Sequence, residues 1–316
     1  MALITPAAAG ATARDVVTAS LTRRDRDVKG LVLLVLLLIS AGFTMLILFV
    51  LLTQVVTEAL PAFRLRGFDF ITDTIGSNPD TAGIWPGLYG SIFIGLGVVV
   101  VSIPLGISAA IYLEEYATTN NRFTRLILVN IRNLAGVPAV IYGVLGLTIF
   151  VQWLEPVTAG ETVITAGLTM AVLVLPIVII TSMEAIRSVP QGLRDAGYGV
   201  GASRWEVTRD HVLPYAAPGI LTGTVLSIAR ALGEAAPLII IGAVAGLLPS
   251  TGLTKNFTAL PFLIFNWSGK NDRPGTEISW SNAAAACAVV LLVLVLFFNT
   301  AAILLRNRFE KRRIGT

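Results

Sequence analysis

Residues Leu31–Gln54 read LVLLVLLLISAGFTMLILFVLLTQ and carry no charged side chain. An apolar run of about 20 residues is long enough to cross roughly 30 Å of hydrocarbon as a helix. Three more uncharged runs follow, at Thr81–Leu113, Thr162–Met183 and Ile278–Leu305. Only 13% of the 316 residues are charged, whereas a soluble domain carries about 25%. The pattern predicts an all-α integral membrane protein and excludes a soluble enzyme, a secreted disulfide scaffold and a disordered chain.

The whole chain divides into six apolar spans by this criterion, which predicts six transmembrane helices. The spans cover residues 31–53, 84–113, 125–153, 162–184, 215–248 and 281–305. We expect residues 1–30 to form a flexible cytoplasmic tail, residues 31–306 one transmembrane domain, and residues 307–316 a basic cytoplasmic tail. The first span has full spanning length and lacks a small-residue cleavage site, so we expect a retained helix and not a signal peptide.

The placement of the basic residues predicts the orientation of the chain. With the N-terminus inside, 17 of the 23 Lys and Arg residues fall on inner segments and five on outer segments, and Arg230 is intramembrane. Cytoplasmic segments of membrane proteins carry such an excess. Trp85, Trp153, Trp267 and Trp280 then fall at outer ends of spans, as in an aromatic belt. We therefore expect a multi-pass protein of the lipid bilayer with both termini in the cytoplasm.

Several kinds of chemistry lack the residues that they need. No G-x-x-x-x-G-K-[ST] motif occurs, so the chain has no phosphate-binding P-loop of its own. His211 is the only histidine and Cys287 the only cysteine, which excludes an intrachain disulfide and a multi-cysteine metal site. The net charge of +4 is explained by membrane orientation and does not require nucleic acid as a partner. We expect no catalytic residue, metal or cofactor in this chain.

The segment Asp195–Pro214, DAGYGVGASRWEVTRDHVLP, connects the fourth and fifth spans on the predicted inner side. Its small residues predict a short helix with a bare face that another protein can approach closely. These small residues are Ala196, Gly197, Gly199, Gly201 and Ala202. Trp205 would anchor that protein, because aromatic side chains in pockets are common interface hot spots. A solvated loop is the alternative, but it leaves Trp205 and the apolar Val200, Val207 and Val212 unexplained.

This segment resembles the signature of ABC-importer permeases, E-A-A-x3-G-x9-I-x-L-P. The matching positions are Asp195, Ala196, Gly197, Gly201, His211, Leu213 and Pro214. The chain departs from the signature at Asp195 (usually Glu), Gly197 (usually Ala) and His211 (usually aliphatic). The resemblance implies a type I ABC-importer permease (MetI-like) fold. It also implies that residues 187–214, which we call the docking loop, form a coupling helix that binds a separate ATPase holding ATP and Mg²⁺.

Three further segments resemble the PstA-type permease of the bacterial phosphate-specific importer. They are AIYLEEY at Ala110–Tyr116, NLAGVPAVIYG at Asn133–Gly143 and RALGEAAPL at Arg230–Leu238. The resemblance covers about Gly83–Leu305. It implies a location in the bacterial inner membrane and a transport subunit that is not an enzyme. The implied partners are a homologous PstC-type permease, a homodimeric PstB-type ATPase and an external PstS-type phosphate-binding protein.

Arg230 and Glu234 are the two ionisable residues deep within a span. They are four residues apart, which predicts one shared helix face. Arg230 lies fifteen residues after Tyr215, or roughly 22 Å along a helix, near the middle of the membrane. Intramembrane charges are costly and usually functional, and the planar donors of arginine suit a tetrahedral oxyanion. We predict that both residues line the substrate path; a purely structural ion pair is the alternative.

Glycine and proline residues also mark the fifth span. Gly219 and Gly223, then Gly242 and Gly246, form two G-x-x-x-G pairs that predict close helix packing, within this chain or against a second one. Pro237 predicts a kink or a loosened turn near the ionisable pair.

Two other functions fit the same residues. One is a permease for another oxyanion, such as sulfate or molybdate, because a charged path alone does not select phosphate. The other is an ion-gradient secondary transporter, which the missing P-loop allows. The signature in Asp195–Pro214 favours the ATP-driven alternatives.

Overall fold

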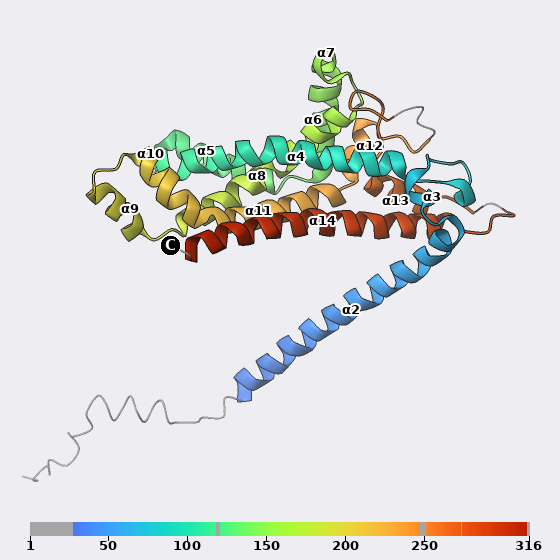
Figure 1. Ribbon diagram of the computed structural model, residues 1–316, viewed down its shortest axis with the longest axis horizontal. Helices are drawn as coiled ribbons and strands as arrows, with labels where there is room; N and C mark the ends of the chain where they lie inside the picture. Colours follow the sequence, from blue (N-terminus) through green and yellow to red (C-terminus); the bar gives the residue numbers. More distant parts are fainter. Residues whose placement is uncertain (1–27, 118–120, 247–250, 273, 315–316) are drawn as a thin grey trace, which may run out of the picture. The chain divides into compact units, whose positions relative to one another are not determined.

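The computed structural model describes residues 28–117, 121–246, 251–272 and 274–314 (Figure 1). Within these ranges the chain consists of helices and connecting segments, with no β-strand. It divides into two compact units, Met1–Gln54 and Val55–Thr316. The predicted tail at residues 1–30 lies outside the described residues except for its last three, so its flexibility stays a prediction.

The described part of the first unit is a single apolar helix. It is the first part of α2 (Val28–Arg66), whose most apolar window has a mean hydropathy of 2.9. The predicted first span, residues 31–53, lies wholly within this helix. Large side chains such as Leu37, Phe43 and Phe49 are exposed. A helix that is apolar around its whole circumference is suited to lipid and not to water.

The second unit is a bundle of long helices joined by shorter ones. The long helices are α4 (Trp85–Ile111), α8 (Val163–Arg187), α11 (Leu213–Gly233) and α14 (Trp280–Ile314), which continues into the predicted tail at residues 307–316. The short helices are α3 (Asp69–Thr72), α5 (Arg122–Ala135), α6 (Ala139–Gly146), α7 (Glu155–Thr158), α9 (Gln191–Gly199), α10 (Arg204–Val207), α12 (Ala236–Ile241) and α13 (Leu260–Ser268). A 3₁₀ turn forms η1 (Pro79–Thr81), and π-helical turns form η2 (Tyr112–Tyr116), η3 (Leu147–Trp153) and η4 (Thr208–Val212).

Glycines bring α4 close to α8. A Cβ added at Gly97 of α4 would lie 3.3 Å from the Cα of Gly167 in α8, and one added at Gly106 would lie 2.6 Å from Val178. The positions advance in the same direction along both helices, so the two helices are parallel. Any larger residue at these glycines would force the helices apart.

The first predicted G-x-x-x-G pair packs within the chain. A Cβ at Gly219 of α11 would lie 2.8 Å from the Cβ of Ala185 in α8, and Gly223 faces Thr181 one turn earlier in α8. The prediction for the second pair is wrong. Gly242 ends α12 with a left-handed φ of 103°, so it does not share a helix face with a residue four positions later.

The predicted third span, residues 125–153, is not one straight helix. α5 and the combined α6 and η3 meet at an angle of 103°. The break falls at Gly136–Pro138, because proline has no N–H to donate and disfavours helical backbone in the residue before it. The Tyr142 hydroxyl donates to the Leu134 carbonyl at 2.8 Å across the bend. Five described helices are individually long and apolar enough to cross a membrane, and the bent pair makes a sixth.

The prediction of an aromatic belt is wrong for two of the four tryptophans. Trp85 and Trp153 are exposed, but Trp267 and Trp280 are buried, with ring centroids 5.5 Å apart. Trp280 also lies under the Lys270 ammonium, 4.3 Å from its ring centroid. These two residues pack α13 onto α14 and do not face lipid.

Candidate functional site

Arg230 lies in the last turn of α11 on an exposed stripe of that helix. Thr222, Leu226, Arg230 and Gly233 are exposed, at spacings of four, four and three residues. Residues at these spacings share one helix face. The face opposite to them packs into the bundle, since Ile228, Ala231 and neighbouring residues are buried.

A groove with a volume of about 660 Å³ runs along the earlier part of this stripe. Thr222 and Leu226 line it from α11, Glu184 from α8, and Asn299 and Arg306 from α14. The Asn299 Oδ1 and Arg306 Nε atoms are buried and lack a hydrogen-bond partner among the described residues. Arg230 does not line this groove, and it lies one turn beyond Leu226 on the same face of α11.

Glu234 does not share a helix face with Arg230, and that prediction is wrong. The helix ends at Gly233, and Glu234 follows it with extended backbone, φ −87° and ψ 123°. A new helix, α12, begins at Ala236 with Pro237 in its first turn, where the missing proline N–H is not needed. The predicted fifth span, residues 215–248, is therefore broken at Glu234. Its last two residues lie outside the described ranges.

The charge of Arg230 has no ionic partner within the described residues. No ion pair or hydrogen bond joins its guanidinium to Glu234 or to another described side chain. An unneutralised arginine attracts an anion, because it keeps its positive charge at any pH relevant to proteins.

The docking loop folds as two short helices and a π-helical turn. Pro190 precedes α9, and α9 ends at a turn in which Gly201 has a left-handed φ of 85°. The Ser203 hydroxyl and the Glu206 carboxylate then form a capping box that starts α10. The Glu206 carboxylate accepts from the Ser203 N–H at 2.7 Å. η4 continues α10 into α11, with Pro214 in the first turn of that helix.

The exposed side of the docking loop is bare and partly apolar. A Cβ added at Gly192, Gly199 or Gly201 would meet no atom within 4 Å. Val200 is 85% exposed and Trp205 is 52% exposed. A bare face is therefore present on this side of the loop, and the anchoring role of Trp205 stays a prediction.

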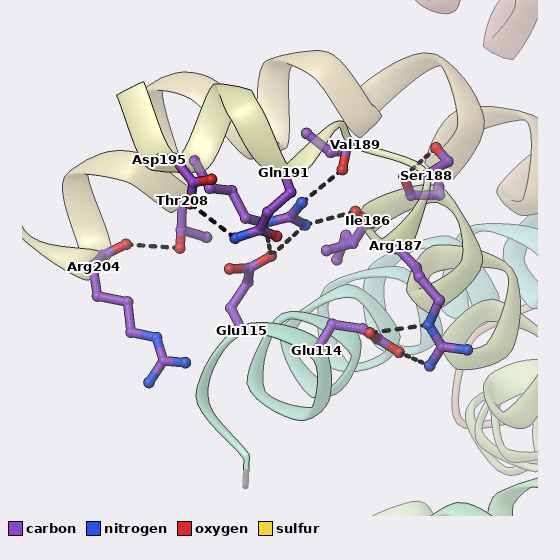
Figure 2. Close-up of polar contacts among 12 residues, drawn as sticks. Glu114, Glu115, Ile186, Arg187, Ser188, Val189, Gln191, Asp195, Arg204 and Thr208 are labelled. Carbon is purple, nitrogen blue, oxygen red and sulfur yellow. Dashed lines mark hydrogen bonds and ion pairs between the residues drawn. The ribbon is translucent and has the colours of Figure 1, made fainter. Parts of the chain in front are cut away.

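The other predicted docking residues divide between this surface and the interior of the loop. Asp195, Ala196 and Pro214 are exposed, whereas Ala202 and Leu213 are half-buried. The Asp195 carboxylate accepts from the Gln191 amide at 3.1 Å (Figure 2).

Gly197 is needed for packing and does not belong to the bare face as predicted. It is buried, and a Cβ there would lie 2.8 Å from the Val207 side chain. Val207 and Val212 are fully buried in the same core as Ile186 and Ile220. Only Val200 of the three valines is therefore available to a partner.

Sequence reasoning missed two ion pairs at the end of α4, of which only one reaches the helices of the docking loop. Glu114 and Glu115 lie in η2, directly after α4. Glu114 pairs with Arg187, the last residue of α8 (Figure 2). Glu115 pairs with Arg194 of α9. Two adjacent carboxylates directly after an apolar span were the available signal.

The docking loop leads into the start of α11, whereas Arg230 lies in the last turn of the same helix. Seventeen residues separate Leu213 from Arg230, which corresponds to roughly 26 Å along the helix. Figure 1 shows α9 and α10 at one end of the bundle and α12 and α13 toward the other end.

No cluster of metal-ligating side chains occurs among the described residues, and the absence of a cofactor stays a prediction.

Solved structures of ABC importers share this fold. A chain of a bacterial alginate ABC transporter, in complex with an alginate-bound periplasmic protein, has a TM-score of 0.60 at 16% identity and covers 88% of this chain and 94% of its own. A chain of the MetNI methionine ABC transporter in an inward-facing conformation has a TM-score of 0.54 at 17% identity, over 72% of this chain and 94% of its own. The predicted all-α, MetI-like permease fold is confirmed.

Residues 102–315 match the family of binding-protein-dependent transport system inner membrane components, and the protein belongs to this family. The phosphate transport system permease protein PstA of Mycobacterium leprae (strain TN) is 32% identical over 64% of this chain and 66% of its own length. PstA 1 of Mycobacterium tuberculosis (strain ATCC 25618 / H37Rv) is also 32% identical, over 64% of each chain. The chain thus spans just under two thirds of the length of these relatives. The predicted resemblance to PstA-type permeases is confirmed, and the protein is a multi-pass membrane component of this family.

Proposed function

We propose that the protein is the transmembrane permease subunit of an ATP-driven importer of inorganic phosphate. The names of the 32%-identical relatives support phosphate as the substrate. The observation that carries the proposal is Arg230, whose guanidinium has no partner among the described residues and lies at the end of an exposed stripe that begins in a groove.

Arg230 would bind the anion through both charge and geometry. An arginine within a membrane costs at least about 2.5–3.5 kcal/mol on insertion scales, and the described residues do not offset it with a carboxylate. A passing phosphate ion would neutralise the charge, and the planar guanidinium can donate two parallel hydrogen bonds to its oxygens. Glu234, on the extended segment just beyond, would accept from a P–OH group of the same ion.

The docking loop would couple this path to a separate ATPase. The bare glycines and Trp205 form a surface that fits a groove on a soluble partner. Closure of a homodimeric PstB-type ATPase on ATP and Mg²⁺ would move the loop and exchange inward-facing for outward-facing states. This chain would hold neither ATP nor another cofactor.

The transport path would need a second permease and an external supplier of phosphate. We assign these roles to a homologous PstC-type permease, which would complete the wall beside the α11 stripe, and to a PstS-type binding protein. The location would be a bacterial inner membrane with both termini in the cytoplasm. The end of α14 lies toward the same end of the bundle as α9 and α10 in Figure 1, which supports a C-terminus on the ATPase side.

A variant of Gly201 tests the coupling role. Gly201→Leu places a side chain on the bare surface and strains a backbone with a φ of 85°. We expect the complex to reach the membrane and hydrolyse ATP without transport. Normal uptake by this variant would contradict docking at this surface.

The substrate is tested by uptake of radiolabelled phosphate in a strain that lacks its own phosphate importer. Expression of this chain with its partner subunits should restore uptake, and excess sulfate or molybdate should not compete. Preferential uptake of sulfate would move the protein to the other oxyanion importers. Transport by a purified complex that lacks an ATPase subunit would instead support a secondary transporter.

A further inference from the structure

Arg194 of α9 is the centre of a buried polar cluster that the transport path does not use. Its Nε and Nη2 atoms donate to the Glu115 carboxylate at 3.2 and 2.9 Å. Its other contacts are with the carbonyls of Val189, at 2.7 Å, and Ile186, at 2.9 Å (Figure 2). The Arg194 and Glu115 side chains are only 12% and 5% exposed. One guanidinium therefore joins α9, the end of α8 and the end of α4.

The geometry of this cluster requires an arginine. The last carbonyls of a helix have no partner within the helix, and the Ile186 carbonyl at the end of α8 accepts from Arg194 as well as from the Val189 N–H. A guanidinium presents five donors in a fixed plane, so it can reach a carboxylate and two carbonyls together. The ammonium of a lysine is a compact point charge on a flexible stem and cannot reproduce that plane.

The chain between α8 and α9 is short and not helical. It consists of Ser188, Val189 and Pro190, and segments of this kind at the ends of helices can act as hinges. Without Arg194, α9 could turn about this connection when a partner presses on the docking loop. Arg194 bridges the connection on one side and reaches α4 on the other.

The adjacent ion pair does not reach the docking helices. Glu114 binds Arg187, the last residue of α8, with an Oε2 to Nε distance of 3.3 Å. The Arg187 side chain is 60% exposed, and exposed pairs contribute little. Glu114 and Glu115 are thus neighbours in sequence with equal charge, but only Glu115 contacts α9.

We propose that Arg194 and Glu115 are positioning residues that fasten α9 to the inner end of α4. A push on the docking loop is then transmitted to α4 and α8 together instead of being absorbed by rotation about Ser188–Pro190. A buried ion pair seldom adds net stability over apolar packing, but removal of one partner leaves a buried charge uncompensated. The pair therefore acts by fixing the position of the docking loop. This proposal rests on the proposed coupling function.

A distance measurement tests the fastening itself, independently of the transported anion. Spin labels are placed at Tyr112→Cys and Gly192→Cys in the full-length chain, purified with its partner subunits in lipid nanodiscs. Both positions are exposed, and the native Cys287 is buried. Glu115→Gln should broaden and shift the distance distribution, whereas Glu114→Gln should leave it unchanged. An unchanged distribution in Glu115→Gln would overturn the proposal.

Coupling provides a second measurement on the same variants. In proteoliposomes, we expect Glu115→Gln to raise the ATP hydrolysed per anion transported by about tenfold, equivalent to about 1.4 kcal/mol, and Glu114→Gln to leave this ratio near that of wild type. A normal ratio in Glu115→Gln would contradict a role in coupling. A wild-type complex that carries no phosphate would refute the proposed substrate but would leave the distance result intact.

A double variant separates position from folding. Glu115→Leu with Arg194→Met removes both charges and leaves no unpaired buried ion, so we expect the complex to assemble. Its loop should still be displaced and its coupling poor, because α9 loses its ion pair with Glu115 and its hydrogen bonds to the Val189 and Ile186 carbonyls. Normal distance and coupling in this variant would overturn the proposal. Loss of assembly in both Glu115→Gln and the double variant would assign the pair to folding and would overturn it equally.

Discussion

A single methyl group at Gly197 tests how the docking loop is packed. In Gly197→Ala the new Cβ would lie 2.8 Å from Val207 Cγ2 and 3.4 Å from His211 Cδ2. Val207 is fully buried, and a β-branched side chain in a helix has one strongly preferred rotamer, so it cannot turn away. The ABC-importer signature has alanine at this position, so the variant restores the family residue and is nevertheless expected to be unfavourable here.

The free-energy change expected for Gly197→Ala is the sum of two opposing contributions. Overpacking of a tight site costs about 1–3 kcal/mol, and alanine in place of glycine within a helix gains up to about 1 kcal/mol. We expect a net loss of roughly 1 kcal/mol in the free energy that holds α9 against α10, or about a fivefold larger open population.

Hydrogen–deuterium exchange of the amides in residues 191–212 measures this loss in the purified full-length protein. Gly192→Ala is the matched control, because it lies in the same helix and its Cβ would meet nothing within 4 Å. We expect faster exchange in Gly197→Ala and equal or slower exchange in Gly192→Ala. Equal exchange in the two variants would refute the packing argument.

Three further predictions concern separate parts of the molecule. Arg230→Gln should abolish anion uptake while the complex still assembles, as measured by uptake and co-purification; failed assembly would point to a structural role. Trp205→Ala should weaken binding of the ATPase subunit by at least about 2 kcal/mol, as expected of a hot spot. Trp153 on η3 is 75% exposed, and Trp153→Ala is the control that should bind normally. Equal affinities of the two variants would exclude Trp205 as the anchor. Asp80→Asn should lower the free energy of unfolding by about 1.5–3 kcal/mol, because the Asp80 carboxylate accepts from the backbone N–H groups of residues 277 and 278 at 3.0–3.1 Å. Asp69→Asn is its exposed control, and equal thermal unfolding of the two would contradict this assignment.

The long helices could be predicted because each carries its own signal. The runs that became α2, α4, α8 and α14 are uncharged over full spanning length, so composition alone locates them. The broken spans could not be predicted in this way. Hydropathy averages over a window and does not register that Gly136–Pro138 turns the chain through 103°.

In the candidate site, too, the sequence could single out one residue but could not place a second residue relative to it. Arg230 is conspicuous because it is a charge within an apolar run, and the structure leaves it exposed, with no partner among the described residues. The placement of Glu234 on the same face failed because Gly233 and Pro237 together end one helix and begin another. Residues four apart share a helix face only where one helix continues through both of them.

The fastening of the docking loop depends on contacts between distant parts of the chain. Glu115 and Arg194 are 79 residues apart, and neither belongs to the signature that identified the loop. The prediction that Val207 and Val212 face a partner failed for a related reason. Their apolar character suggested a partner, but the loop buries them against its own helices.

We propose that a transported phosphate ion passes Arg230 under the control of an ATPase docked on residues 187–214. The most direct measurement is uptake of radiolabelled phosphate into proteoliposomes that contain the complete complex, with ATP supplied on the ATPase side, for wild type and Arg230→Gln. We predict ATP-dependent phosphate uptake by wild type that excess sulfate does not reduce, and no uptake by an assembled Arg230→Gln complex. Equal phosphate uptake by the two complexes, or uptake that sulfate suppresses, would contradict the account.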